Sequence, residues 1–418
     1  MSSRLARFHI LALAMLLLPV AAEAQTHQRR HGLPEAALDY SFAAGASEVT
    51  VPFELAHNHI VIPVSVNGSE PFRVILDTGM PTGGIFLFGN ERVLELDLPY
   101  GNMQVQIGGV GGDGKFRTAQ IAQGLTLRVG DLELRGSNAI VTPPVEHFTA
   151  DQDGVIGAVL FENFIVQIDY EKMRIRIREP EGFIPPQGAS EIPLAIRGRM
   201  PFVSATVSVN QGEPIPVEMV LDLGASHALS LKRDSEKGLV PPPGALETVI
   251  GRGLTGRVTG QLARIDSLQL GDQELRNVLV SFPESRFQQT ISMNSRNGNL
   301  GNGTMQRFHV TFDYGNKRLF LKPNNSFKKP FEYDMSGIRL REDRDRPFWI
   351  EELLPGSPGL DAGLQVDDIL VDVNGRAAEE MGLEELKELF KREGEEVSLI
   401  FQRGSERIKV KIKLRRLV

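Results

Sequence analysis

The 418-residue sequence contains no cysteine and only one tryptophan. The lack of cysteine excludes disulfide bonds, cysteine-based catalysis, iron–sulfur clusters and zinc sites built on thiolates. An excess of positive charge is also missing, because 46 Lys and Arg residues stand against 53 Asp and Glu residues. The resulting net charge of −7 gives no electrostatic footprint for a nucleic acid partner. Hydrophobic residues make up 41% of the chain, which is typical of globular proteins, and the length predicts two or three domains.

The N-terminus carries the pattern of a secretory signal. Arg4 and Arg7 precede a short apolar run, and the small residues Ala22 and Ala24 lie where signal peptidase requires them. The run is too short to span a membrane comfortably, which favours a cleaved signal over a membrane anchor. We therefore interpret residues 1–24 as a signal peptide and expect export, with the periplasm as the destination and secretion as the alternative.

The chain contains an internal repeat. The segments Leu76-Asp77-Thr78-Gly79 and Leu221-Asp222-Leu223-Gly224 each end an apolar strand pattern, and their Asp residues lie 145 positions apart. Farther on, two Asp-Tyr pairs that begin at 169 and 313 lie 144 positions apart. Alternating and β-branched segments between Asn-Gly and Gly-Asp turns predict strands throughout both copies. We therefore expect two copies of one all-β unit.

The domain boundaries follow from these repeats. After an N-terminal segment at 25–49, which is a candidate pro-segment, we expect one unit at 50–184 and the other at 190–325. Pro-rich sequence between them is typical of a connection. Residues 327–418 predict a third, mixed α/β unit, because a helical pattern over 383–391 lies among strand patterns.

These motifs carry a family resemblance. An Asp-x-Gly element on an apolar strand, with Ile156-Gly157 about 80 residues later, resembles the catalytic half of aspartic proteases. The two copies resemble the bilobal pepsin-like pattern, although each is compact like a retroviral-type protease subunit. In the third unit the order Gly-Ser-Pro, Ala-Gly-Leu, Asp-Asp-Ile and Val-Asn-Gly resembles a PDZ domain. The chain thus resembles a bacterial aspartyl protease family protein with a PDZ module. The resemblance implies a mainly β fold with two retropepsin-like lobes followed by a small α/β PDZ domain.

The resemblance also implies that Asp77 and Asp222 are the catalytic pair of an exported aspartic endopeptidase. Two adjacent carboxylates cannot both ionise cheaply, so they share one proton. The ionised member then deprotonates the attacking water, and the protonated member donates to the carbonyl oxygen of the peptide bond. This chemistry requires no cofactor, and we expect none.

Three residues are expected to support the pair. Gly79 and Gly224 allow each loop to turn tightly and to bring backbone N–H groups near the carboxylates. Thr78 stands where the family has a hydroxyl that binds the opposite lobe. Its counterpart is Leu223, which has no hydroxyl, so the contact between the lobes is expected from one side only.

Each half has a glycine-rich segment at the position where family members close a flap over the substrate. The glycines concerned are Gly108, Gly109, Gly111 and Gly112 in the first half, and Gly251 and Gly253 in the second. Neither segment contains the Tyr of a pepsin-like flap, which favours the retroviral type. Glycine content alone equally allows a tight loop without this role.

In the PDZ-like unit, Ser336, Gly337, Ile338 and Leu340 lie on the segment that resembles a carboxylate-binding loop and its strand. The resemblance implies that backbone N–H groups there bind the C-terminal carboxylate of a peptide, which adds as a strand beside this segment. The expected partners are therefore a peptide or protein substrate and a C-terminal peptide ligand. We expect no nucleic acid partner and no stable membrane span after signal cleavage.

Two other patterns offer alternatives. His57 and His59 have the spacing to place two imidazoles on one strand face, but no third ligand is identifiable, so no metal site is expected. Ser226 and His227 are adjacent and would point to opposite faces of a strand, which argues against a serine-hydrolase pair. The alternative function is a catalytically weak or inactive protease-like scaffold that acts through its PDZ domain. Pepstatin-sensitive turnover of casein or peptides distinguishes the two.

Overall fold

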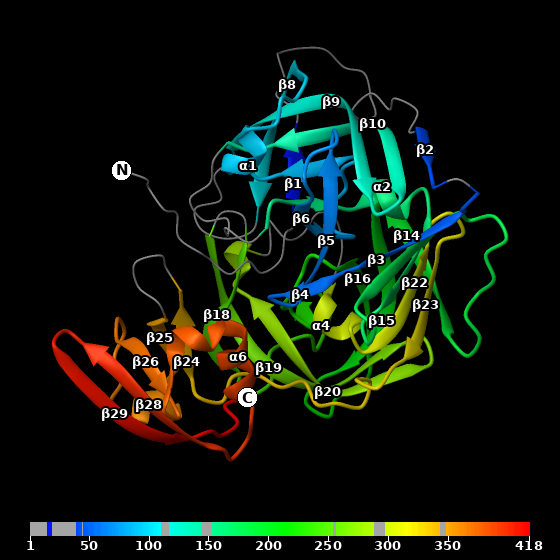
Figure 1. Cartoon of the computed structure of the whole chain (residues 1–418). Helices are drawn as coiled ribbons and strands as arrows, with labels where there is room; N and C mark the ends of the chain where they lie inside the picture. The colour runs from blue at the N-terminus through cyan, green and yellow to red at the C-terminus, as the bar shows by residue number, and fades with distance from the viewer. Residues whose placement is uncertain are drawn as a thin grey trace, which may run out of the picture.

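A computed structural model describes residues 15–18, 39–43, 45–109, 117–143, 152–253, 256–287, 297–342 and 348–418. Strands dominate the described residues and the helices are short, which confirms the mainly β fold predicted from the sequence. Figure 1 shows the two halves of the repeat together, with the C-terminal unit, in orange and red, against the second half. None of the described helices is long and apolar enough to cross a membrane.

The first lobe is a ten-stranded sheet in the order β1-β8-β9-β10-β7-β11-β6-β5-β4, with β2 beside β10. Its strands are β1 (Met15–Leu18), β2 (Asp39–Ser41), β4 (Glu54–Ala56), β5 (His59–Val66), β6 (Phe72–Leu76), β7 (Ile85–Leu87), β8 (Tyr100–Gly109), β9 (Arg117–Val129), β10 (Leu132–Val141) and β11 (Gly154–Ile156). Two short helices, α1 (Glu91–Leu94) and α2 (Ala158–Phe161), accompany them. Apart from β1, the predicted signal peptide at 1–24 lies outside the described residues.

The second sheet has thirteen strands in the order β18-β19-β20-β17-β21-β16-β15-β14-β23-β22-β12-β13-β3. Its strands from the second half are β14 (Ser190–Arg197), β15 (Met200–Ser208), β16 (Ile215–Asp222), β17 (Leu229–Leu231), β18 (Leu246–Gly253), β19 (Gly256–Leu270), β20 (Gln273–Pro283), β21 (Gly298–Gly301), β22 (Phe308–Asp313) and β23 (Arg318–Pro323), with α4 (Asn302–Met305). The first half contributes β3 (Glu48–Pro52), β12 (Ile165–Asp169) and β13 (Arg174–Arg178). The sheet therefore crosses the boundary between the lobes.

The repeat seen in the sequence is also a repeat of strand pairing. In the first lobe β6 runs parallel to β11, with Leu76 opposite Ile156. In the second lobe β16 runs parallel to β21, with Leu221 opposite Leu300. The parallel pair β7–β10 likewise corresponds to β17–β20. Each Asp-x-Gly loop thus follows a central strand that is paired with an apolar-Gly strand.

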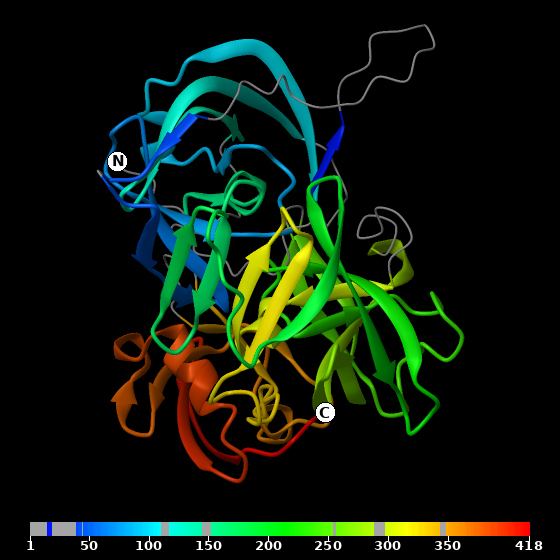
Figure 2. The same ribbon diagram turned by 90° about the vertical axis from the view of Figure 1, so that its right-hand side faces the viewer.

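The two halves meet at the antiparallel pair β12–β22. Gln167 lies opposite Thr311, which is its own counterpart 144 residues later in the repeat. Three strands from the first half (β3, β13 and β12) and three from the second (β22, β23 and β14) flank this junction. Figure 2 shows these strands, in blue, green and yellow, between the lobes. The pairing of equivalent residues means that the junction has approximate two-fold symmetry.

The hydrophobic core is continuous across this junction. Phe161 of the first lobe lies edge-on to Phe312 of the second at a centroid distance of 5.0 Å. Tyr314 stacks on the same ring at 5.4 Å. Burial of these aromatic side chains removes a large apolar area from water and holds the lobes together.

The C-terminal unit has its own sheet and its own core. Its elements are β24 (Ile338–Arg341), β25 (Trp349–Leu353), α5 (Pro358–Asp361), β26 (Ile369–Val373), β27 (Arg376–Ala377), η1 (Ala378–Glu380), α6 (Gly382–Leu389), β28 (Glu396–Arg403) and β29 (Glu406–Lys413). The strand order is β24-β25-β26-β28-β29, with β27 beside β26. The helix expected at 383–391 is α6, which buries Leu383, Leu386 and Leu389 at helical spacing.

Truncation of Phe312 tests the core between the lobes. Phe312→Ala should lower the free energy of unfolding by about 3–5 kcal/mol, because it removes a fully buried ring and leaves a cavity. Far-ultraviolet circular dichroism in urea measures this change for the whole chain. The matched control is Ile184→Ala, because Ile184 is 81% exposed. A Phe312→Ala loss no larger than that of the control would contradict the assigned packing.

Candidate active site

Two strand ends place Asp77 and Asp222 together at the contact between the lobes. Asp77 follows β6, and its backbone N–H donates to Ile156 O at 2.9 Å. Asp222 ends β16 opposite Gly301 of β21. The side chains are almost inaccessible, with exposures of 0% for Asp77 and 2% for Asp222. Each apolar-Gly strand therefore lies beside the loop that presents one carboxyl group.

The two glycines of the Asp-x-Gly loops are required by the approach of the opposite carboxyl group. A Cβ atom on Gly79 would lie 2.7 Å from Asp222 Oδ1. A Cβ atom on Gly224 would lie 2.3 Å from Asp77 Cγ. Real Cβ atoms do not approach other atoms this closely, so only glycine fits at either position. The backbone of each lobe thus packs directly against the carboxyl group of the other.

Hydrogen bonds hold one oxygen of each carboxyl group. The backbone N–H groups of Gly79 and Gly224 donate to Asp77 Oδ1 at 2.6 and 3.1 Å. The side-chain amide of Asn299 donates to Asp222 Oδ2 at 2.7 Å. Asp77 Oδ2 and Asp222 Oδ1 receive no hydrogen bond from the described residues. Each carboxyl group therefore has one oxygen that accepts hydrogen bonds from the protein and one oxygen without a donor among the described residues.

Asn299 was missed by the sequence analysis as a functional residue. It lies on β21, where its counterpart in the first lobe is Val155 of β11. The sequence did contain one signal, because Asn299 places an amide on a buried strand where the repeat has the apolar Val155. Only the folded structure shows that this amide reaches Asp222.

The proximity of the two carboxyl groups changes their titration. Burial raises the pKa of Asp77 well above the ordinary value of 3.8, and the neighbouring charge of Asp222 raises it further. The two N–H groups that donate to Asp77 oppose this shift without cancelling it. A pair of this kind retains a proton at pH values where isolated carboxyl groups have lost theirs.

Thr78 forms the contact between the lobes that the sequence predicts, and it does so from one side. Its hydroxyl donates to Leu221 O at 2.7 Å and accepts from the Leu223 N–H at 3.0 Å. Leu223 has no hydroxyl to return this contact, and its side chain is fully buried in the core. One threonine thus holds both a carbonyl and an N–H group of the opposite loop.

The two candidate histidines lie in different surroundings. His57 has a φ of 51° in the turn between β4 and β5, and its Nδ1 lies 2.7 Å from Glu384 Oε1 on α6 of the C-terminal unit. His59 begins β5 and is fully buried. Burial lowers the pKa of His59 to about 4, so the ring is neutral near pH 7. The shared strand face that their spacing allowed is not formed.

The glycine-rich segments lie on two equivalent hairpins. Gly108 and Gly109 end β8, which pairs with β9. Gly251 and Gly253 lie on β18, which pairs with β19. The other two predicted flap glycines, Gly111 and Gly112, lie outside the described residues.

A cavity of about 240 Å³ lies beside β24 and α6, and Gly251 and Arg252 of β18 also line it. Gly337, Ile338 and Leu340, which the sequence predicted to bind a peptide, line this cavity. The predicted residue Ser336 is fully buried and is not among the lining residues.

The N–H groups of the predicted carboxylate-binding loop already have acceptors. Asp334 Oδ1 accepts from the N–H groups of Ser336 and Gly337 at 3.0 and 2.6 Å. The Ile338 N–H donates to Ser336 Oγ at 3.0 Å. Burial raises the pKa of Asp334 to about 6, so this carboxyl group is mostly ionised at neutral pH. A ligand's terminal carboxylate would have to displace Asp334 to use these donors.

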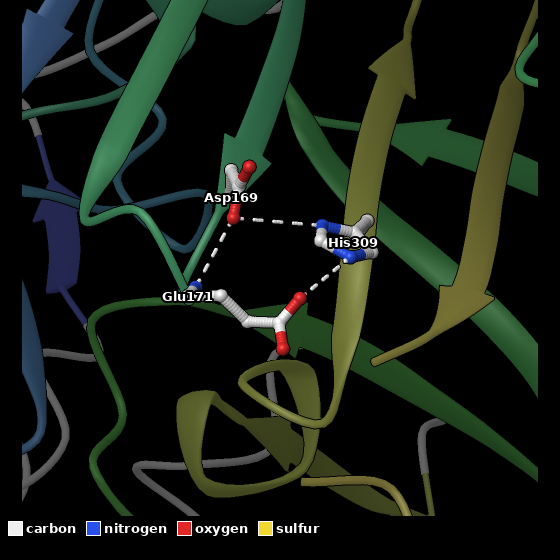
Figure 3. Close-up of side chains that lie close together, drawn as sticks. All are labelled: Asp169, Glu171 and His309. Atoms are coloured by element: carbon white, nitrogen blue, oxygen red, sulfur yellow. Dashed lines mark hydrogen bonds and ion pairs between the residues drawn. The ribbon is translucent and has the colours of Figure 1, made fainter. Parts of the chain in front are cut away.

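A further polar group lies at the junction of the two halves. Asp169, at the end of β12, and Glu171 lie beside His309 of β22 (Figure 3). One carboxylate oxygen of each acid and one ring nitrogen of the histidine, atoms that could ligate a metal ion, lie within 4.8 Å of one another. His309 Nε2 is 3.0 Å from Glu171 Oε2, and its Nδ1 is 3.6 Å from Asp169 Oδ1. The sequence analysis missed this group because His309 follows Asp169 by 140 positions and Glu171 by 138. Its position makes it a polar contact between the lobes.

Comparisons with known proteins find similarity in both parts of the chain. A family model described as aspartyl protease matches residues 62–160 and again 205–303, and one described as PDZ domain matches residues 349–403. The chain is similar to the crystal structure of an aspartic proteinase from Irpex lacteus, with a TM-score of 0.43 and 11% identity. That match covers 68% of this chain and 99% of the other. No curated protein matches the chain.

Replacement of Thr78 tests the contact between the lobes. Thr78→Val should lower the free energy of unfolding by about 1–3 kcal/mol, because it leaves the Leu223 N–H and the Leu221 carbonyl without their partner. Urea denaturation followed by circular dichroism measures the loss. Thr78→Ser keeps the hydroxyl and is the matched control. Equal stability of the Val and Ser variants would show that the hydroxyl does not hold the lobes.

The raised pKa of Asp77 predicts a pH-dependent stability. The folded chain binds this proton more tightly than the unfolded chain, so wild-type stability falls as the pH rises above 3.8 and through the raised pKa. Asp77→Asn removes this titration and should therefore be more stable than wild type at pH 7, by a margin that shrinks toward pH 3.8. Urea denaturation at several pH values tests this, with Asp97→Asn, at an exposed position, as the control. A margin independent of pH would contradict the shift.

Proposed function

Since the chain carries two aspartyl protease repeats followed by a PDZ domain, we propose that it is an aspartic endopeptidase that hydrolyses peptide bonds with a water activated by Asp77 and Asp222. The observation that carries this proposal is the contact of two buried carboxyl groups, each packed against the glycine of the opposite loop. Burying two carboxyl groups side by side costs free energy, and the arrangement suits a reaction in which the pair shares one proton.

The oxygens that accept hydrogen bonds from the protein and those that do not have different proposed roles. Asp77 Oδ1 and Asp222 Oδ2 are held by protein donors, so Asp77 Oδ2 and Asp222 Oδ1 are the atoms that bind the attacking water. The ionised carboxylate takes a proton from this water as the water oxygen forms a bond to the carbonyl carbon. The protonated carboxyl group donates its proton to the carbonyl oxygen, which gives a neutral tetrahedral diol. Collapse of the diol breaks the C–N bond. The carboxyl group that took the water's proton donates it to the leaving nitrogen, and the other carboxylate takes a hydroxyl proton from the diol as the product carboxyl group forms.

The two carboxyl groups act as one titrating pair. Burial and the neighbouring charge of Asp222 raise the pKa of Asp77, which favours one proton held by the pair. Two backbone N–H groups donate to Asp77 and one side-chain amide donates to Asp222. The pair titrates as a unit, so the acid and base roles are proposed for the pair and neither role is assigned to one aspartate.

The remaining parts of the chain have roles in access and recruitment. The hairpins β8–β9 and β18–β19 are proposed as flaps, because they occupy equivalent places in the repeat and carry the predicted glycines. The PDZ domain is proposed to recruit peptide or protein partners. The N-terminal sequence pattern supports export, with the periplasm as the proposed location.

Replacement of each aspartate tests the reaction. Asp77→Asn and Asp222→Asn should each reduce kcat/KM for peptide hydrolysis by at least about 1,000-fold, because neither carboxyl group can serve as both acid and base. The double variant should be little worse than either single one, since the two residues act as a unit. Mass-spectrometric mapping of cleavages in a proteome-derived peptide library measures this, with and without pepstatin.

The controls separate this pair from two other arrangements. Asp97→Asn, at an exposed site, should keep wild-type activity. If Asp77 instead paired with Asp77 of a second chain, Asp222→Asn would be active and its activity would fall on dilution. Peptidase activity in Asp222→Asn would therefore refute the intramolecular pair. A wild-type chain that binds peptides without cleaving any would favour the scaffold alternative.

A further inference from the structure

We propose that Asn58 is a positioning residue for the hydrolysis. From the first lobe it holds the second-lobe segment that carries Asp222, and so keeps the carboxyl group of Asp222 in register with that of Asp77. The inference rests on the function proposed above, because it concerns the same pair of aspartates. It adds a residue that lies outside both Asp-x-Gly loops.

A tight turn presents Asn58 to the second lobe. His57 and Asn58 are the two residues between the paired Ala56 and His59 of β4 and β5, and their φ values are 51° and 65°. Positive φ at both positions of a two-residue hairpin loop is typical of a turn that favours asparagine. The hairpin therefore fixes the backbone from which the Asn58 side chain extends.

Asn58 forms three hydrogen bonds, and all of them cross to the second lobe. Its Nδ2 group donates to Ser226 O, and its Oδ1 accepts from Gln306 Nε2 at 3.1 Å. Its backbone carbonyl accepts from Asn302 Nδ2 at 2.8 Å. Both ends of the side-chain amide are thus bound by residues of the opposite lobe.

Two of these partners lie on the segments next to Asp222. Ser226 follows Asp222 by four residues. Asn302 begins α4, directly after the strand β21 that pairs with β16. The Asn302 N–H donates to Ala225 O at 2.7 Å, which joins the two segments. Asn58 therefore contacts the loop after Asp222 and the helix beside that loop at the same time.

Thr78 and Asn58 hold the Asp222 segment from the first lobe at two separate points. The hydroxyl of Thr78 bonds the backbone on both sides of Asp222. Asn58 bonds the carbonyl of Ser226 at the far end of the loop. A loop held at both points keeps the carboxyl group of Asp222 against Gly79, whereas loss of the Asn58 side chain releases the far end.

The repeat supports this role, because the equivalent turn of the second lobe also crosses to the first. Gly198 and Arg199 join β14 to β15 with φ values of 54° and 71°. Arg199 Nε lies 3.3 Å from Glu162 Oε1, just after α2, and its guanidinium group lies against Gly83 in the segment after Asp77. Each lobe thus reaches the surroundings of the opposite aspartate through the same turn.

Glycine substitution of Asn58 tests the proposal in the full chain. Glycine adopts the positive φ of this position without strain, so Asn58→Gly removes the side-chain hydrogen bonds and keeps the turn. With a fluorogenic peptide chosen from the mapped cleavage sites, kcat per folded molecule should fall at least about tenfold while KM changes less than about twofold. The reason is that the reacting groups lose their register while the peptide-binding surface is kept.

Asn67→Gly is the matched control. Asn67 follows the other end of β5, has a φ of 49°, and accepts from the Thr126 N–H at 2.9 Å within the first lobe. This variant also loses a side-chain hydrogen bond from a turn, and it should keep kcat within about twofold of wild type. An equal fall of kcat in Asn67→Gly and Asn58→Gly would overturn the proposal.

Asn58→Asp tests the hydrogen bond to Ser226 directly. The new side chain has nearly the same shape and keeps an acceptor for Gln306, but at neutral pH its carboxylate cannot donate to Ser226 O. We therefore expect kcat to fall as it does in Asn58→Gly. Wild-type kcat in the Asp and Gly variants would show that Asn58 does not position the pair.

Hydrogen exchange separates a failure of this proposal from a failure of the proposed function. Mass spectrometry should show that peptides covering residues 221–228 exchange at least about threefold faster in Asn58→Gly than in wild type or Asn67→Gly. This measurement needs no hydrolysis. A wild-type chain that cleaves no peptide would refute the endopeptidase, whereas unchanged exchange over 221–228 in Asn58→Gly would refute the positioning role.

Discussion

The contact between the two Asp-x-Gly loops is the constraint on which the rest of the structure depends. Each loop must bring its glycine against the carboxyl group of the opposite lobe, at distances that no other residue tolerates. This approach requires that the lobes be held in one fixed relation. The β12–β22 pairing, the aromatic core around Phe161 and the bridging hydroxyl of Thr78 provide that relation. The geometry of the aspartate pair is therefore a property of the interface between the lobes.

A duplicated scaffold need not give a symmetric site. The strands around Asp77 and Asp222 pair in the same way, and Gln167 pairs with its own counterpart at the junction. The differences include the hydroxyl of Thr78 in one lobe and the amide of Asn299 in the other. The backbone N–H groups also differ, because those of Gly79 and Gly224 both donate to Asp77. The two carboxyl groups therefore have different surroundings on a repeated scaffold.

The sequence predicted what local pattern and repetition encode. The offset between Asp77 and Asp222 identified the pair and the two lobes, and the helical spacing of leucines located α6. Contacts between distant segments were not predicted where neither the repeat nor a family motif marks them. The hydrogen bond between His57 and Glu384 joins residues 327 positions apart, which no periodicity indicates. The hydrogen bonds of Asp334 join neighbouring residues, but an Asp before a glycine-containing loop is common in many kinds of turn. Only the folded loop therefore shows which N–H groups Asp334 accepts.

The PDZ domain contacts both halves of the protease part. Through Glu384 on α6 it contacts His57, in the turn two residues before the buried His59 of the first lobe. Through Arg339 it contacts Val249 on β18, the outer strand of the second hairpin. The ion pairs of Arg252 and Arg257 with Glu351 add further contacts between β18, β19 and the PDZ domain. Since packed interfaces resist continuous deformation, a displacement of α6 relative to β24 would have to be absorbed within this set of contacts or transmitted to one of the lobes.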